Sequence, residues 1–367
     1  MPPDAPSRLA GRSRGVQWGA LLAATAGLIA LFDLLGMPAA VLLGAVGGGM
    51  LAAGNGARVR MPQWSFVAAQ GVIGCMIAHS MQPDILAELW ADWPLCVAAV
   101  FSVIFASCLL GWVLARRQVL PGTTAVWGLS PGAATAMILM SEAYGADVRL
   151  VAFMQYLRVV LVVLAASAVS RIWGISPQAA AQAAATPGWF APVAAGPFAA
   201  TLALALVGAW AARWLRLPAG SLLLPLAVGV ALQNSGMLAL TLPPWLLGLS
   251  YAAIGWSIGL RFDRAVLLHA LRALPRVILA VLALMAICGL LAVALAELGG
   301  VDPLTAYLAT SPGGADSVAI IAASSPVDLP FVMALQTARF ILVILLGPAL
   351  ARVVAQYSGR MGQMPRP

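Results

Sequence analysis

Lysine is absent from this sequence of 367 residues, and charged residues of any kind are scarce. Charged side chains make up 9% of the chain, hydrophobic ones make up 62%, and the mean hydropathy is +0.97. Soluble globular proteins carry about 25% charged residues, so this chain has too few polar side chains to cover a surface that faces water. The composition excludes a secreted enzyme and a disordered regulator, and it predicts an integral membrane protein.

The basic residues are all arginine, 20 of them against 12 acidic residues, which gives a net charge of +8. Nucleic-acid-binding proteins are also basic, but here most arginines stand singly or in pairs between apolar runs. This distribution is typical of the cytoplasmic loops of membrane proteins. We therefore expect the lipid bilayer as a partner, and no nucleic acid.

Side chains that could bind a metal are few. The chain has four cysteines without a Cys-x-x-Cys pair, and its two histidines, His79 and His269, are far apart in the sequence. Redox copper and iron centres are built from several imidazoles or thiolates, and structural zinc sites use closely spaced pairs. The sequence therefore predicts no metal, no cofactor and no structural disulfide, and it disfavours a membrane oxygenase.

Apolar runs long enough to cross a bilayer recur along the chain, since a spanning helix needs about 20 residues. The first run follows three arginines, but it is too long for a signal peptide and no cleavage site stands out, so we interpret it as a transmembrane helix. Two further segments, 121–142 and 303–325, are interrupted by Ser-Pro-Gly, and 172–194 is a weakly apolar linker. The predicted spans are 16–34, 37–54, 64–81, 93–115 and 148–171, then 195–213, 217–234, 243–260, 276–298 and 329–351.

The second set of spans repeats the first. A shift of 181 residues aligns Pro62 to Arg158 with Pro243 to Arg339 without a gap. Trp, Pro, Asp, Gln and Arg coincide in this register, which is hard to obtain by chance in so apolar a chain, so we infer an internal duplication. In particular, Ser130-Pro131-Gly132 falls on Ser311-Pro312-Gly313, and Gln155-x-x-Arg158 falls on Gln336-x-x-Arg339.

The arginines distinguish two arrangements of the halves. If each Ser-Pro-Gly segment enters and leaves on one side, each half has an odd number of spans, and the second half is inverted. Seventeen arginines then face the cytoplasm, with Arg171 outside and Arg158 and Arg339 within the membrane. If the segments cross completely, the halves are parallel, with 11 arginines inside and seven outside. The positive-inside rule favours the first arrangement.

The sequence thus predicts an all-α polytopic membrane protein with two inverted-topology repeats. Each repeat has five transmembrane helices plus one re-entrant or broken helix, and both chain termini lie in the cytoplasm. The predicted segments are a cytoplasmic N-terminal segment (1–15), a first membrane repeat (16–171), a linker (172–194), a second membrane repeat (195–355) and a cytoplasmic tail (356–367).

Each Ser-Pro-Gly tripeptide is the predicted start of a half-helix near the bilayer centre, because Ser is a good N-cap and Pro is favoured at the first helical position. A helix start presents free N–H groups and a partial positive charge, which suit an anion. One such motif is equally well a plain kink, but two at matching positions favour the lining of a substrate cavity. The predicted substrate-binding residues here are Ser130, Pro131, Gly132, Ser311, Pro312, Gly313 and Gly314.

The two Gln-x-x-Arg pairs lie within apolar helices. A charge at that depth is costly, so it normally faces the protein interior or water. Arginine suits carboxylate or phosphate groups, and residues three apart share a helix face. Both substrate contact and a structural ion pair remain open for Gln155, Arg158, Gln336 and Arg339.

Three aspartates are candidates for ion coupling. Asp316 follows the second Ser-Pro-Gly, where the first half has Thr135, and it is suited either to carrying a proton or sodium ion or to neutralising an arginine. Asp147 and Asp328 begin helices and serve equally well as caps or as functional groups.

In these elements the sequence resembles the bacterial AbrB family of membrane proteins. The resemblance rests on the duplicated Ser-Pro-Gly segment followed by Asp147 to Arg158 and by Asp328 to Arg339, and it extends from about residue 16 to residue 355. One departure is Ala133, where the second copy has Gly314. The resemblance implies the labels ammonia monooxygenase or regulator of gene expression, but the chain lacks the metal ligands for the first and a soluble basic domain for direct DNA binding.

The leading hypothesis is an ion-coupled secondary transporter of a small anionic solute in the bacterial inner membrane, and not an enzyme. Inverted-repeat transporters place the substrate near the midplane, where broken helices meet. The alternative is a membrane-embedded regulator that acts through a partner or a solute level, for which 261–275 is the candidate docking loop. A membrane enzyme ranks third. Homo-oligomerisation is left open.

Overall fold

The structure is a computed structural model that describes residues 9–35, 39–81, 93–120, 123–130, 137, 141, 146–172, 189, 192–215, 217, 220–262, 273–339 and 342–343. The regular structure within these ranges is α-helical, and none of them forms a strand. Several predicted features lie outside the described residues, namely 1–8, most of the linker, the tail and Pro131 with Gly132. The side chain of Asp316 lies outside them too.

The helices agree with the predicted spans to within a few residues wherever their ends are described, which confirms the all-α class. Among the described residues, α1, α5, α8, α10 and α14 are long and apolar enough to cross a membrane. The first half contains α1 (Arg14–Leu34), α2 (Ala40–Gly54), α3 (Gln63–Ser80), α5 (Trp93–Arg116), α6 (Thr124–Leu129) and α8 (Val148–Ile172). The second half contains α10 (Ala195–Trp214), α11 (Gly220–Asn234), α12 (Pro244–Gly259), α14 (Leu274–Gly299), α15 (Pro303–Thr310) and α16 (Ala315–Ala323), followed by a helix over 329–339.

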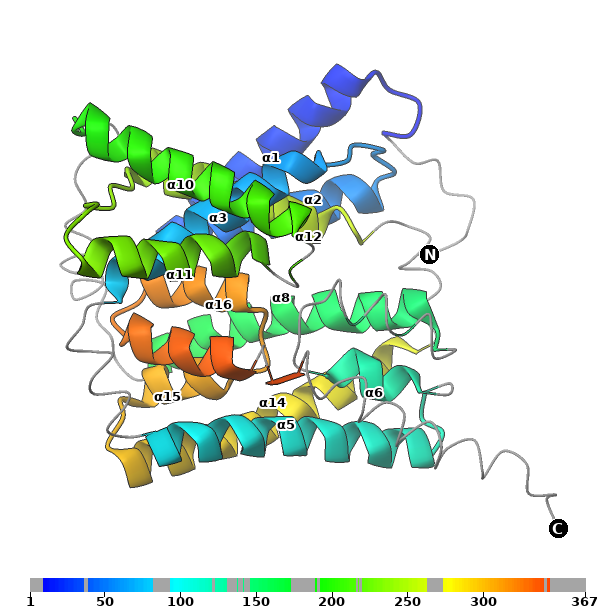
Figure 1. Ribbon diagram of the computed structural model, residues 1–367. Helices are drawn as coiled ribbons and strands as arrows, with labels where there is room; N and C mark the ends of the chain where they lie inside the picture. Colours follow the sequence, from blue (N-terminus) through cyan, green and yellow to red (C-terminus); the bar gives the residue numbers. More distant parts are fainter. Residues whose placement is uncertain are drawn as a thin grey trace, which may run out of the picture. The chain divides into compact units, whose positions relative to one another are not determined.

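The chain forms two compact units, and each unit takes matching helices from both halves of the sequence (Figure 1). The first unit contains α1, α2 and α3 together with α10, α11 and α12, and it also contains residues 319–326, which include most of α16. The second contains α5, α6 and nearly all of α8 together with α14, α15, the start of α16 and the helix over 329–339. A shift of 181 residues carries the start of α1 onto that of α10 and the start of α5 onto that of α14, so the repeat register extends to the helix bounds.

Glycines bring helices of the two halves together in the first unit. A Cβ atom at Gly255 of α12 would lie 2.8 Å from the carbonyl oxygen of Leu42 in α2. Its counterpart Gly74 of α3 packs still more closely on the carbonyl of Leu222 in α11. Close backbone approach at small residues is the usual way in which helices associate in lipid, where no hydrophobic driving force acts between them. The matching positions of the two glycines explain why both contacts form.

In the second unit, the matching helices α5 and α14 run in opposite directions (Figure 1). A Cβ atom at Gly299, the last residue of α14, would lie 2.6 Å from Cδ2 of Leu95, near the start of α5. The end of one helix therefore packs on the beginning of its sequence counterpart.

The two ends of each interrupted segment lie in the second unit and are joined by a hydrogen bond. The backbone N–H of Asp147 donates to Oγ1 of Thr124 at 3.1 Å, and that of Asp328 donates to Oγ1 of Thr305 at 3.2 Å. Thr124 is the first residue of α6 and Asp147 directly precedes α8, so the chain leaves this point and returns to it 23 residues later. Both segments are hairpins that are closed at the base by matching threonines.

Candidate functional site

The tip of the second hairpin is a break between α15 and α16. Because proline has no N–H, the break leaves a backbone carbonyl of α15 without its helical donor. Pro312 cannot donate to the carbonyl of Leu308, four residues earlier, as a helix would require. Nε2 of Gln336 supplies the missing donor at 2.7 Å from Leu308 O, and it also lies 3.3 Å from Ser311 O. Gln336 is 1% exposed. It therefore replaces a backbone hydrogen bond that the break removes.

The first hairpin repeats this arrangement atom for atom among its described residues. Pro131 removes the donor for the carbonyl of Trp127, and Nε2 of Gln155 donates to that oxygen at 2.8 Å. The same Nε2 lies 3.2 Å from the carbonyl oxygen of Ser130. Trp127 and Ser130 coincide with Leu308 and Ser311 under the 181-residue shift. In both halves, therefore, the carbonyl that proline leaves without a donor is bound by the matching glutamine.

The two arginines complete the caps of the short helices. Nη1 of Arg158 donates to Ser130 O at 2.8 Å, and its Nη2 donates to Oε1 of Gln155 at 2.8 Å. Nη1 of Arg339 donates to Ser311 O at 2.6 Å, and its Nη2 donates to Gly313 O at 3.1 Å and to Oε1 of Gln336. A cation at a helix C-terminus also complements the negative end of the helix dipole. Every described contact of these guanidinium groups is therefore with a break or with its own glutamine.

Helix α8 lies between the two breaks. It carries Gln155 and Arg158, which bind the first break, and the second break packs on the next turn of the same helix. A Cβ atom at Gly313 would lie 3.2 Å from Cγ1 of Val162, and one at Gly314 would lie 3.7 Å from Cγ2 of Val159. The structure thus brings together the described candidate residues of both halves: Ser130, Gln155, Arg158, Ser311, Pro312, Gly313, Gly314, Gln336 and Arg339.

Buried donors remain at this junction after the caps are formed. Nε of Arg158 and Nε of Arg339 are buried and make no hydrogen bond to any described atom, and neither does the hydroxyl of Tyr307. The two arginines are 1% and 3% exposed. Buried charge is costly unless it is paired, and among the described side chains the site has an excess of positive charge and of unsatisfied donors.

The comparison with known proteins places the chain in a family. The family described as "Transition state regulatory protein AbrB" matches residues 41–355. The chain belongs to the AbrB family. It is 44% identical to the "Putative regulator AbrB" of Escherichia coli K12, over 94% of this chain and 98% of the relative. It is 30% identical to the "Uncharacterized protein YhjN" of Bacillus subtilis 168, over 79% of this chain and 78% of the relative. The resemblance inferred from the sequence is confirmed.

Asp147 and Asp328 of this AbrB-family chain cap helices at the hairpin bases, away from the breaks. Oδ1 of Asp147 accepts from the N–H groups of Arg149 and Leu150, both at 3.1 Å, at the start of α8. Oδ1 of Asp328 accepts from the N–H of Phe331 at 2.9 Å. The structure does not bring Asp147 or Asp328 to the tips.

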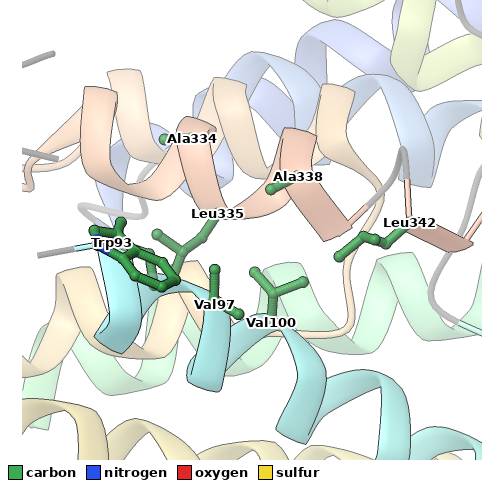
Figure 2. Close-up of a pocket in the computed structure, with 8 residues that line it drawn as sticks. Trp93, Val97, Val100, Ala334, Leu335, Ala338 and Leu342 are labelled. Atoms are coloured by element: carbon green, nitrogen blue, oxygen red, sulfur yellow. The ribbon is translucent and has the colours of Figure 1, made fainter. Parts of the chain in front are cut away.

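The pocket in Figure 2 is a different kind of site. It has a volume of about 180 Å³ and lies in the second unit, between α5 and the helix that carries Gln336 and Arg339. Its lining is uncharged and almost wholly apolar, so it offers nothing to an anion. The lining residues are Trp93, Cys96, Val97, Val100, Ala334, Leu335, Ala338 and Leu342. In the described part of the chain, no group of three or more His, Cys, Asp or Glu side chains is placed to hold a metal ion.

Sequence reasoning missed Tyr307 and Thr310. Tyr307 carries one of the unsatisfied donors, and Oγ1 of Thr310 donates to the carbonyls of Ala306 at 2.9 Å and Cys288 at 3.2 Å. A comparison of the halves contains the signal, because Val126 and Leu129 occupy the matching positions. Polar residues that replace apolar ones in a repeat mark the half whose break has additional polar groups around it.

Proposed function

We propose that this AbrB-family protein is a secondary transporter of a small anionic solute, coupled to a proton or sodium gradient. The observation that supports it is the pair of buried guanidinium groups beside the two helix breaks. Among the described atoms, some of their N–H groups have no hydrogen-bond acceptor, and no carboxylate contacts them. A transporter needs a site that is incomplete until its substrate arrives, and an anion at this junction would neutralise charge that is otherwise costly to bury.

The proposed topology is a multi-pass protein of the bacterial inner membrane with two inverted repeats and both termini in the cytoplasm. Hairpins closed at their bases by Thr124 and Thr305 favour segments that do not cross, which leaves an odd number of spans in each half. The opposite directions of α5 and α14 agree with inversion. The positive-inside distribution of the arginines favours the same arrangement.

Within this proposal the two breaks hold the substrate near the midplane, as in other transporters with discontinuous helices. Gln155 and Gln336 keep the breaks open by satisfying their carbonyl groups, and Arg158 and Arg339 supply the positive potential. The proposed substrate-binding set is Ser130, Pro131, Gly132, Gln155, Arg158, Ser311, Pro312, Gly313, Gly314, Gln336 and Arg339.

We further propose Asp316 as the ion-coupling carboxylate, because it lies in the first turn of α16, directly after the second break. Asp147 and Asp328 complete the proposed coupling set at the hairpin bases, where one oxygen of each carboxylate already caps a helix. An Asp316→Asn variant is expected to lose the dependence of uptake on the driving ion while retaining exchange of substrate.

Uptake into proteoliposomes tests the proposal. Vesicles with purified protein are supplied with radiolabelled acetate, lactate, succinate or phosphate under an imposed pH or sodium gradient. We expect gradient-dependent accumulation of at least one anion, and its loss in Arg339→Gln. Arg213→Gln serves as the matched control and should retain uptake. Arg213 is an exposed arginine of the first unit, where it donates to Gln63 of the same unit. Absence of uptake for every anion under both gradients would contradict the proposal.

The name of the Escherichia coli relative favours a second candidate, a membrane-embedded regulator that acts through a partner or a solute level and not by binding DNA. The proposed docking loop is 261–275, most of which lies outside the described residues. Deletion within this loop separates the two candidates. If the protein is a docking regulator, the deletion abolishes its effect on gene expression, and no transport is measured with or without the loop. If the protein is a transporter, the deletion variant retains uptake.

A further inference from the structure

The two breaks are equivalent in their caps but differ in the side chains around them. Around the second break, Tyr307 stands in place of Val126 and Thr310 in place of Leu129. Gly314 also replaces Ala133, which removes a methyl group beside the start of α16. Additional hydroxyl groups and a smaller residue therefore occur together on one side of the junction, which a purely symmetrical site would not need.

Two positive features converge at the second break. Nη2 of Arg339 donates to Gly313 O at 3.1 Å, which fixes the guanidinium group within two residues of the start of α16. The first hydrogen bond inside α16 runs from Val318 N to Gly314 O at 2.9 Å, so the N–H groups of the first turn have no carbonyl partner within the helix. These N–H groups form the positive end of the helix dipole. A buried cation beside them is unfavourable unless an anion lies between.

The hydroxyl of Tyr307 is a third donor at this place. Tyr307 lies one turn before the break, because the N–H of Ser311 donates to its carbonyl at 2.8 Å. The side chain is 8% exposed, and its hydroxyl has no partner among the described atoms. Nη1 of Arg339 donates to the carbonyl of the same Ser311 at 2.6 Å. The unsatisfied hydroxyl and the unsatisfied Nε of Arg339 therefore belong to two residues that both bond to Ser311 at the break.

We propose that the second break binds the carboxylate of a small organic acid, with Nε–H of Arg339, the hydroxyl of Tyr307 and the N–H groups of the first turn of α16 as its donors. This inference rests on the proposed function and names the substrate class and the contacting half. The few donors suit two carboxylate oxygens with a single charge, whereas a tetrahedral dianion has more oxygens to satisfy and a second charge to bury. Arg158, at the first break, is then a positioning residue.

Two variants test the assignment without disturbing the fold. Tyr307→Phe removes a hydroxyl that has no described partner, so no group is orphaned by the change. Gly314→Ala restores the residue of the first half, and its Cβ would lie 3.7 Å from Val159 and 4.0 Å from Ser317, which are ordinary contacts. Tyr251→Phe, whose hydroxyl bonds Met76 in the other unit, is the matched control.

Binding of acetate, lactate and succinate to the purified full chain is measured by calorimetry and thermal shift, with sulfate as the tetrahedral probe and chloride as the baseline. We expect at least one carboxylate to bind the unmodified protein, and to bind the control variant with the same Kd. Its Kd should rise at least about 10-fold in Tyr307→Phe and in Gly314→Ala. The melting temperatures of both variants without ligand should remain unchanged.

The outcomes separate this inference from the proposed function. Carboxylate binding that is unchanged in both variants, with uptake intact, overturns the assignment to the second break and leaves transport standing. Binding of sulfate without any carboxylate overturns the substrate class. Absence of both binding and uptake for every anion contradicts the inference and the proposed function together.

Discussion

Replacement of Gln336 by leucine removes the side chain that substitutes for the missing N–H of Pro312. Its Nε2 donates to Leu308 O at 2.7 Å, and its Oε1 accepts from Nη2 of Arg339. Leu308 O keeps a second donor, Oγ of Ser311 at 3.0 Å, so this carbonyl is not orphaned. The main loss is therefore the acceptor for a buried guanidinium N–H.

The magnitude follows from that charge. Hydrogen bonds to charged groups contribute about 1.5–3 kcal/mol, whereas neutral bonds between helices in membranes average about 0.6 kcal/mol. We expect Gln336→Leu to lower the free energy of unfolding by about 2–3 kcal/mol, dominated by the charged bond. Gln336→Glu should cost less, because it retains an acceptor for Arg339 while it loses the donor to Leu308.

Unfolding in mixed detergent micelles, followed by tryptophan fluorescence, measures this difference. Gln233→Leu is the control, because Gln233 makes two exposed bonds, to His79 O at 2.9 Å and to His79 Nδ1 at 3.3 Å, and their loss should cost less than about 1 kcal/mol. If Gln336→Leu is no more destabilising than Gln233→Leu, then the glutamine does not support the break and the structural reasoning is wrong.

Three further changes test the fold, each measured by the same unfolding assay. Thr305→Val removes the acceptor for the N–H of Asp328 at the hairpin base and should cost about 1–3 kcal/mol, with faster hydrogen exchange at that amide. Gly255→Ala should cost about 1–3 kcal/mol by overpacking, whereas Gly289→Ala, with open space around it, should be neutral or stabilising. Asp302→Ala removes the N-cap of α15 and should cost about 1 kcal/mol, so an unchanged stability would refute its capping role.

The positions of the helices and of the two breaks follow from the sequence. Long apolar runs specify spanning helices, and a Ser-Pro-Gly sequence favours a helix break, because proline lacks the N–H and restricts the preceding residue. The 181-residue register then adds independent support, since the same signals occur twice. These are local rules, and local rules suffice to place α6 and α15.

The partners of the buried polar residues do not follow from the sequence. Pro312 predicts that Leu308 O lacks its helical donor, but the sequence does not indicate that Gln336, 28 residues away, provides a replacement. The sequence left substrate contact and ion pairing open for Arg339, and the described hydrogen bonds are with two backbone carbonyls and Oε1 of Gln336. The interleaving of the halves in two compact units was not visible either, because a repeat does not reveal which copy each helix packs against.

Cysteine accessibility tests the central claim, that the two halves are inverted so that their hairpins meet from opposite sides. Single cysteines are placed at Gln178 and at Ser358 in a background without the four natural cysteines, and intact cells are treated with a membrane-impermeant thiol reagent. The account predicts labelling at position 178 and protection at position 358. Protection at both positions would make the halves parallel and contradict the inverted arrangement on which the proposed transport site depends.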